Sequence, residues 1–323
     1  MWLAPLRLKA SAMEKSYRTW LIDSHRWRAF RPRSGDVVVA TYPKSGTTWM
    51  QRILSLLIFR SGQPVALDSL FPWLEANRRP IEEVVAGLEA QVHRRSVKTH
   101  VPFDAIPKLD GVKFIHVARD GRDVAMSYHH HCTAYQPEAL ARMDAIGLAD
   151  PSVGKPYPRV DPSAAAYFHN WLTVGAIDGQ PDGTPYLSYF GYEKSFFDAR
   201  RNPQLLFVHY NDLRSDLVGE MLRIVDFMEA DVPRGEVATL AGFASLDSMS
   251  REAAKLVPEY ARNFGGSSLP FIHKGGAGRW RGIFHEADLA LFEEKLRAAV
   301  PESYADWLLE GRMASGGVDP SEM

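Results

Sequence analysis

The sequence predicts a three-layer α/β/α fold around a doubly wound, mostly parallel sheet with a P-loop-like anion-binding loop. Three observations indicate this fold. Short apolar runs alternate with helical patterns along the chain. The first run, DVVVAT at 36–41, is apolar and β-branched, as in strands that are buried on both faces. The loop that follows, TYPKSGTTW at 41–49, passes directly into a helical pattern, and ligands of such sheets lie beyond the carboxyl ends of strands.

The elements follow from the hydrophobic pattern. Residues 1–35 are rich in aromatic and basic side chains and are predicted to form a lead-in segment with a short helix. After the first strand, TTWMQRILSLLIF has apolar residues at helical spacing over 47–59. The same patterns predict strands at 96–100, 112–119 and 204–210, and helices at 120–131, 211–228, 234–244, 245–256 and 286–300.

The pattern indicates one domain over 36–312, followed by a flexible tail at 313–323. The segment 132–203 differs from the rest because it is rich in Pro, Gly and aromatic residues around one apparent helix at 163–174. A long excursion with little regular structure usually has a function. We therefore expect an insertion that shapes a pocket on the same sheet.

Composition excludes several classes of protein. The net charge of the 323 residues is −1 and the pI is about 6.8, so no global field favours nucleic acid or an anionic membrane. No run of about 18 apolar residues occurs without a charge, so we expect no membrane span. Cys132 is the single cysteine, which excludes an intramolecular disulfide and a cysteine-based zinc site. A cytoplasmic location is predicted.

The loop has the features of an anion site. The amides of Ser45, Gly46, Thr47 and Thr48 lie where the chain turns into a helix, so they can point together at an anion and add the helix dipole. Gly46 allows close approach of the backbone, and the threonines offer hydroxyl donors. Lys44 precedes the turn and would reach the anion from its far side. The alternative is an ordinary turn with a solvated lysine.

The order of residues in this loop argues against a metal-dependent nucleotide site. Walker loops place the lysine after the last glycine, and they need a magnesium-binding acid at a strand end. Here Lys44 precedes Gly46, and the strand at 112–119 ends in Arg119. The run HHH at 129–131 cannot converge on one ion, because successive helical residues point about 100° apart. We therefore expect no metal, and an anion such as a sulfuryl group that reacts without one.

Five segments occur in the order of a known family's signatures. They are TYPKSGTTW, KTHVP (98–102), ARDGRDVAMSY (118–128), VHYNDL (208–213) and HKGGAGRWRGIF (273–284). Together they resemble the cytosolic-type sulfotransferases, which use 3′-phosphoadenosine 5′-phosphosulfate (PAPS) and release adenosine 3′,5′-bisphosphate (PAP). The resemblance extends from Asp36 to the last helix.

The resemblance assigns roles in nucleotide binding. It implies that the first loop holds the 5′-phosphosulfate, with Lys44 near the bridging oxygen. It further implies contacts of the adenine with Trp49 and Tyr210, and of the 3′-phosphate with Arg119, Ser127, Lys274 and Gly275. From the residues alone, Trp49 and Tyr210 also fit core positions, and Arg119 also fits an ion pair with Asp123.

The resemblance also implies the catalytic residues. His100 matches the family's base, and a partly neutral imidazole suits removal of a hydroxyl proton. Lys98 lies two residues away on the same strand face and matches a residue that stabilises the transferring group. A structural histidine and a solvated lysine are the alternatives.

Three segments depart from the family's pattern. His273 replaces an arginine of the last signature, Arg279 replaces an aspartate, and Ala244-Ser245-Leu246 replaces an adenine contact. We expect weaker or more pH-dependent nucleotide binding. The family's C-terminal dimerisation signature is not evident, although a homodimer is possible.

The predicted activity is transfer of a sulfuryl group from PAPS to a hydroxyl or amine of a small acceptor. A phenol or an apolar alcohol is expected, because six aromatic residues occur in segments that could line a pocket: Phe71, Trp73, Phe103, Tyr135, Phe190 and Tyr192. Two alternatives remain open, a P-loop nucleoside or nucleotide kinase and a non-catalytic nucleotide-binding protein of the same fold.

Overall fold

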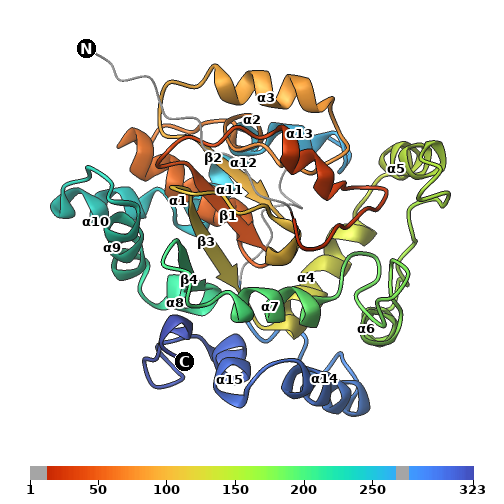
Figure 1. Ribbon diagram of the computed structural model, residues 1–323. Helices are drawn as coiled ribbons and strands as arrows, with labels where there is room; N and C mark the ends of the chain where they lie inside the picture. Colours follow the sequence, from red (N-terminus) through yellow and green to blue (C-terminus); the bar gives the residue numbers. More distant parts are fainter. Residues whose placement is uncertain (1–12, 267–275) are drawn as a thin grey trace.

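A four-stranded parallel sheet forms the centre of the protein (Figure 1). The computed structural model describes residues 13–266 and 276–323. The strand order is β2 (Ser96–Thr99), β1 (Val37–Thr41), β3 (Lys113–Ala118) and β4 (Leu205–His209). In the register, Val39 of β1 pairs with Lys98 of β2 and with Ile115 of β3. All five residues of β1 are buried, as its continuous apolar pattern predicts.

Helices lie on both sides of this sheet. In Figure 1, α3 lies at the top of the view and α14 and α15 lie at the bottom, with the strands between them. The helices are α1 (Thr47–Phe59), α2 (Leu67–Leu70), α3 (Ile81–Glu89), α4 (Gly121–Thr133), α5 (Pro137–Ala149), α6 (Ala164–Thr173), α7 (Tyr189–Asp198), α8 (Tyr210–Ser215), α9 (Leu217–Met228), α10 (Arg234–Gly242), α11 (Leu246–Arg251), α12 (Ala253–Leu256), α13 (Pro258–Ala261), α14 (Glu286–Ala299) and α15 (Glu302–Glu310), with short 3₁₀ helices at Ser24–Ala29, Phe103–Ala105 and Pro320–Glu322.

The predicted fold class is confirmed, and each predicted strand is found within one residue at either end. The helix predicted at 211–228 is wrong in one respect, because Asp216 divides it into α8 and α9. Its carboxylate accepts a hydrogen bond of 2.8 Å from the Gly219 amide and so caps α9. The segment 245–256 is likewise divided at Glu252.

The segment 132–203 contains more regular structure than its composition indicates. It forms α5 and α7 in addition to the predicted helix, which is α6. It also contributes Tyr135 and Tyr186 to the cavity described below. After residue 312, Asp319 pairs with Arg223 at 2.7 Å, so this part of the tail contacts α9. The domain boundaries remain a prediction.

The parallel topology brings four strand ends to one edge of the sheet. The loop with Lys44 follows β1, His100 follows β2, Arg119 follows β3 and Tyr210 follows β4. This is the edge at which doubly wound sheets bind ligands. Over the described ranges, no helix is long and apolar enough to span a membrane.

A buried ion pair holds the opposite edge of the sheet together. Asp36, before β1, accepts hydrogen bonds of 3.0 Å and 2.5 Å from Arg95, before β2. The side chains are 4% and 1% exposed, and Asp36 also accepts a hydrogen bond from the Arg33 amide. A buried charge is costly when it loses its partner, so this pair fixes the start of two neighbouring strands.

Replacement of Asp36 tests this pair. Asp36→Asn is expected to lower the free energy of unfolding by about 3 kcal/mol, because Arg95 loses its buried carboxylate partner and keeps only Glu89, which is 45% exposed. Denaturant unfolding measures the change. The matched control is Asp226→Asn, since Asp226 pairs with Arg234 where both side chains are 63% exposed. That variant should lose no more than about 1 kcal/mol. Equal losses in the two variants would contradict the role of Asp36.

Candidate active site

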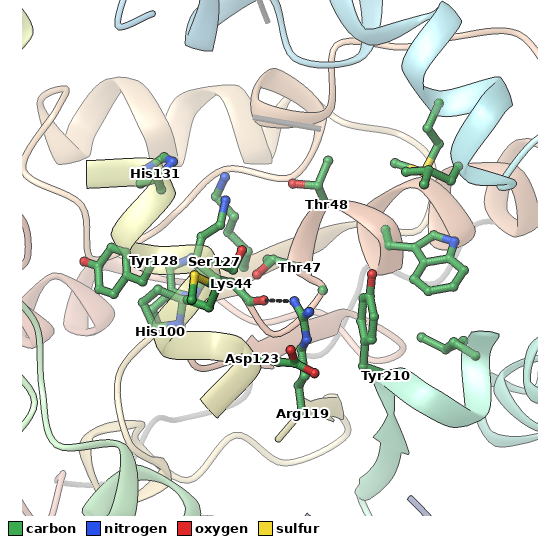
Figure 2. Close-up of a pocket in the computed structure, with 18 of the residues that line it drawn as sticks. Lys44, Thr47, Thr48, His100, Arg119, Asp123, Ser127, Tyr128, His131 and Tyr210 are labelled. Atoms are coloured by element: carbon green, nitrogen blue, oxygen red, sulfur yellow. Dashed lines mark hydrogen bonds between the residues drawn. The ribbon is translucent and has the colours of Figure 1, made fainter. Parts of the chain in front are cut away.

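A cavity of about 550 Å³ lies at the carboxyl edge of the sheet (Figure 2). One end is lined by the anion loop and the ends of β3 and β4, and the other end by side chains around His100. The lining residues predicted from sequence are Lys44, Gly46, Thr47, Thr48, Trp49, Lys98, His100, Arg119, Ser127 and Tyr210. The structure thus brings together most of the predicted site. Lys274 and Gly275 lie outside the described residues.

The loop between β1 and α1 is built around two residues with positive φ. Gly46 has φ +118° and precedes α1, and Lys44 has φ +76°. A Cβ atom at position 46 would lie 3.1 Å from the Tyr210 ring, so only glycine fits there without strain. One expectation is wrong, because the Ser45 amide donates to the Tyr42 carbonyl at 3.1 Å and is used in the turn.

The remaining amides of the loop suit an anion. Among the described residues, the amides of Gly46, Thr47, Thr48 and Trp49 have no hydrogen-bond acceptor. These are the first amides of α1, where the helix dipole favours negative charge. The Ser45 hydroxyl and Arg119 Nε are also buried without a hydrogen-bond partner in the described part of the chain. Donors left unpaired at one end of a cavity fit the phosphate and sulfate oxygens of a nucleotide such as PAPS.

Lys44 combines burial with neighbouring positive charge. Burial, together with the positive charge of Arg119, lowers the pKa of Lys44 to about 8. The Lys44 carbonyl accepts a hydrogen bond of 3.2 Å from Arg119, which Figure 2 marks. Near neutral pH the lysine is therefore still largely protonated and can attract an anion.

Arg119, Tyr210 and Trp49 form one wall of the nucleotide end. The Arg119 guanidinium lies 4.3 Å from the centre of the Tyr210 ring, and its Nη2 donates to the Gly276 carbonyl at 2.9 Å. The Tyr210 ring packs edge-on against Trp49 at 5.4 Å, and the Trp49 indole donates to the Ala244 carbonyl. Asp123 accepts hydrogen bonds from the Gly278 amide, so its carboxylate has a backbone partner. Both rings line the cavity and thus are not simply core residues.

His100 is held in one tautomer. Its Nδ1 lies 2.8 Å from the Thr41 carbonyl and 3.2 Å from the Thr41 hydroxyl. A carbonyl oxygen only accepts, so Nδ1 carries the hydrogen and Nε2 keeps its lone pair. The Thr41 hydroxyl also lies 2.6 Å from that of Thr47, which links His100 to the start of α1. This arrangement provides a neutral base beside the anion loop.

The surroundings keep this imidazole neutral. Burial lowers the pKa of His100 to about 3, and the positive charges of Lys98 and Arg78 act in the same direction. The hydrogen bond to Thr41 opposes this shift. His100 can therefore accept a proton at neutral pH, but the resulting imidazolium needs nearby negative charge.

Lys98 has a partner that the sequence pattern did not indicate. Its Nζ forms a buried ion pair with Asp68 and lies 3.5 Å from the Tyr260 hydroxyl. Burial opposes the charge of Lys98, but Asp68 more than compensates and raises the lysine pKa. Lys98 is thus a charged but locally neutralised member of the cavity wall.

Glu75 is a second residue that the sequence pattern did not indicate. One oxygen of this fully buried carboxylate accepts hydrogen bonds from the Trp73 indole at 2.6 Å, the Thr99 hydroxyl at 2.9 Å and the His100 amide at 2.7 Å. The Trp73 ring in turn packs edge-on against the His100 ring at 4.8 Å. Glu75 therefore holds both the backbone of His100 and the ring beside its imidazole.

The wall around His100 differs in part from the sequence prediction. Trp73 and Tyr135 line the cavity as expected. The expectation is wrong for Phe71, Phe190 and Tyr192, which belong to the buried core, and for Phe103, which packs against Phe114 and Phe196. Residues that the sequence prediction missed complete this wall: Leu21, Arg78, Tyr128, His131, Tyr186 and Tyr260.

The run of histidines at 129–131 has three separate sets of contacts. His129 Nε2 bonds the Asp161 carbonyl, His130 contacts Arg279, and His131 bonds the Tyr135 hydroxyl. Only His131 lines the cavity. Within residues 13–266 and 276–323, no group of three or more His, Cys, Asp or Glu side chains could hold a metal ion.

A parallel α/β sheet with this loop at its carboxyl edge is typical of proteins that bind the anionic groups of a nucleotide. The chain belongs to the sulfotransferase domain family, whose model matches residues 34–306. It is therefore a sulfotransferase, with PAPS as its co-substrate.

Relatives extend over nearly the whole chain. A glycolipid sulfotransferase of Mycobacterium bovis is 33% identical and covers 94% of this chain and 96% of its own length. Sulfotransferase 1E1 of Rattus norvegicus is 27% identical, over 82% of this chain and 83% of that protein. The crystal structure of mouse sulfotransferase SULT7A1 complexed with PAP shares the fold, with a TM-score of 0.64, 21% identity and coverage of 88% and 92%.

Variants of Glu75 test its effect on His100. Glu75→Ala is expected to lower kcat by about 10²-fold, because a small displacement of a reacting group has an effect of this size. The affinity for PAP should remain unchanged, because Glu75 does not contact the nucleotide end of the cavity. Glu75→Gln should retain most of the activity, because a carboxamide oxygen can accept the same three hydrogen bonds. Steady-state kinetics and PAP titration measure these effects.

The matched control is Glu193→Gln. Glu193 is also fully buried and accepts hydrogen bonds from His116 and Tyr304, away from the cavity. Its replacement should change stability without lowering kcat. An equal loss of kcat in Glu75→Gln and Glu75→Ala would contradict a role that rests on hydrogen-bond geometry.

Proposed function

We propose that this sulfotransferase transfers the sulfuryl group of PAPS to a hydroxyl of a small acceptor, with His100 as the general base. The observation that carries the proposal is the neutral imidazole in the same cavity as the anion loop, with its Nδ1 hydrogen held by the Thr41 carbonyl. A non-catalytic nucleotide-binding protein would not need this base.

The proposed step conserves atoms and charge. The acceptor oxygen forms a bond to sulfur in line with the bridging oxygen, and the acceptor proton moves to His100 Nε2. The bond between sulfur and the bridging oxygen breaks, and PAP leaves with the electron pair on its 5′-phosphate. The proton on His100 is then released to solvent. No metal takes part in this scheme.

The loop and the lysines stabilise charge in this proposal. The amides at the start of α1 bind the phosphosulfate, and Lys44 neutralises the charge on the leaving phosphate. Lys98 lines the same cavity as His100, and its ion pair with Asp68 keeps it protonated, so it can stabilise charge on the sulfuryl oxygens. Trp49 and Tyr210 contact the adenine, and Arg119, Ser127, Lys274 and Gly275 bind the 3′-phosphate.

The acceptor is proposed to be a phenol or an alcohol on a ring. The rings of Trp73, Tyr128, Tyr135, Tyr186 and Tyr260 line the cavity near His100, and flat rings pack well against aromatic side chains. Four of these side chains also offer hydroxyls, which favours a second candidate, a sugar hydroxyl of a glycolipid. The glycolipid sulfotransferase of M. bovis supports that candidate. Turnover of PAPS on a panel of phenols, sterols and glycolipids decides between the two.

Replacement of His100 tests the base. His100→Ala is expected to lower kcat by at least about 10²-fold, which is the usual minimum for a general base. PAP affinity should remain, because no nucleotide contact is lost. Kinetics with PAPS and titration with PAP provide the two measurements. The control is His169→Ala, since His169 is exposed and pairs with Asp288 away from the cavity. Near-normal turnover of His100→Ala would exclude the mechanism.

The pKa of Lys44 predicts how nucleotide binding depends on pH. A protonated lysine attracts the phosphate, so PAP affinity should be constant below the Lys44 pKa of about 8 and fall as the pH rises through it. Titration calorimetry from neutral to alkaline pH measures this dependence. Lys44→Met should bind more weakly and lose the dependence. A wild-type affinity that rises with pH would contradict the assignment.

A further inference from the structure

We propose that Arg78 makes this site selective for acceptors that carry an anionic group, such as a carboxylate, besides the hydroxyl that receives the sulfuryl group. The inference rests on the proposed function, because it concerns the acceptor that His100 activates. It names a substrate class, and it assigns a role to a residue that belongs to none of the five signatures.

Arg78 lies close to the proposed base. Its guanidinium carbon is 5.2 Å from the centre of the Trp73 ring and 5.8 Å from the centre of the Tyr260 ring. The Trp73 ring is itself 4.8 Å from the His100 ring. Two consecutive ring contacts therefore connect the guanidinium to the imidazole, and all four side chains line the same cavity. An acceptor bound beside His100 can therefore contact Arg78 within the same cavity.

Arg78 forms no ion pair with a carboxylate in the described part of the chain. Burial opposes its charge, but Tyr260, Tyr135 and Asp68 more than compensate and raise the pKa of Arg78. Among the described residues, no Asp or Glu lies within ion-pair distance of Arg78, and the segments 1–12 and 267–275 contain neither residue type. The other cation near His100, Lys98, already pairs with Asp68. His100 and His131 are neutral, because burial lowers the pKa of both. The acceptor end of the cavity thus carries a net positive charge at Arg78.

The remaining charged groups belong to the other end of the cavity. Lys44, Arg119, Arg214 and Arg279 line the nucleotide end, where the phosphates of PAPS provide the negative charge. Asp123, at that end, is bonded to the Gly278 amide. The nucleotide leaves the charge of Arg78 unmatched in this arrangement. A planar guanidinium held beside two aromatic rings is well suited to bind a carboxylate through two hydrogen bonds.

Three acceptors with the same phenol test the proposal. These are para-hydroxyphenylacetate, which is anionic, tyrosol, which is neutral, and tyramine, which is cationic at neutral pH. The wild-type enzyme is expected to show a kcat/KM for the acid about tenfold above that for the amine. This ratio is the effect expected from one partly screened charge pair between Arg78 and the acceptor. Arg78→Glu should reverse the order of acid and amine, and Arg78→Met should remove the preference without reversing it.

The matched control is Arg79→Glu. It changes the net charge equally at a neighbouring exposed arginine, but Arg79, unlike Arg78, is not among the residues that line the cavity. This variant should keep the wild-type ratio of acid to amine. A reversal in Arg79→Glu as large as in Arg78→Glu would attribute the preference to overall charge and overturn the proposal.

Binding to the enzyme–PAP complex tests Arg78 without turnover. Titration calorimetry with the same three phenols should show tighter binding of the acid by the wild type and of the amine by Arg78→Glu. Equal binding of acid and amine by the wild type, or no detectable binding of the acid, would overturn the inference. If the three phenols bind in the predicted order but no sulfated product forms, the proposed transfer to a phenol is wrong. The selectivity of Arg78 would still hold in that case.

Discussion

The hydrogen bond from His100 to the Thr41 carbonyl joins the two functions of this cavity. Thr41 ends β1 and begins the anion loop, and His100 follows β2, so the bond exists only because these strands are parallel neighbours in register. It selects the imidazole tautomer and links it through Thr41 and Thr47 to the start of α1. The position of the base relative to the anion loop thus depends on the strand order of the sheet.

The low pKa of His100 follows from the same burial that forms the cavity. A base with a pKa of about 3 is weak, and burial penalises the imidazolium that proton transfer would form. A bound phosphosulfate brings negative charge close to the ring and raises this pKa, since opposite charge favours the protonated form. In the proposed mechanism, the nucleotide is therefore both the sulfuryl donor and part of the electrostatic environment that makes His100 an effective base.

The nucleotide end could be predicted from sequence, and the residues that support His100 could not. The anion loop is encoded locally, since a buried strand, Gly46 and a helix start occur within about a dozen residues. Asp68 belongs to the short helix α2, Glu75 and Arg78 follow it in a loop before α3, and none of the three is part of a periodic pattern. Their partners, such as Thr99 and Lys98, lie 20 to 30 positions away in the chain. Only the path of the folded chain shows that these side chains meet β2.

This difference reflects how the two ends of the cavity recognise their ligands. The nucleotide end relies on backbone amides and on strand ends, which a short pattern of residue types is sufficient to specify. The acceptor end is built from side chains of separate segments: Leu21 before the sheet, Trp73 and Arg78 after α2, and Tyr135, Tyr186 and Tyr260 from later helices and loops. Its shape and charge are fixed only by tertiary packing, around Arg78, the ion pair of Lys98 with Asp68, and several phenol hydroxyls. In the proposed mechanism, most of the side chains that would contact the acceptor therefore lie outside the five signatures.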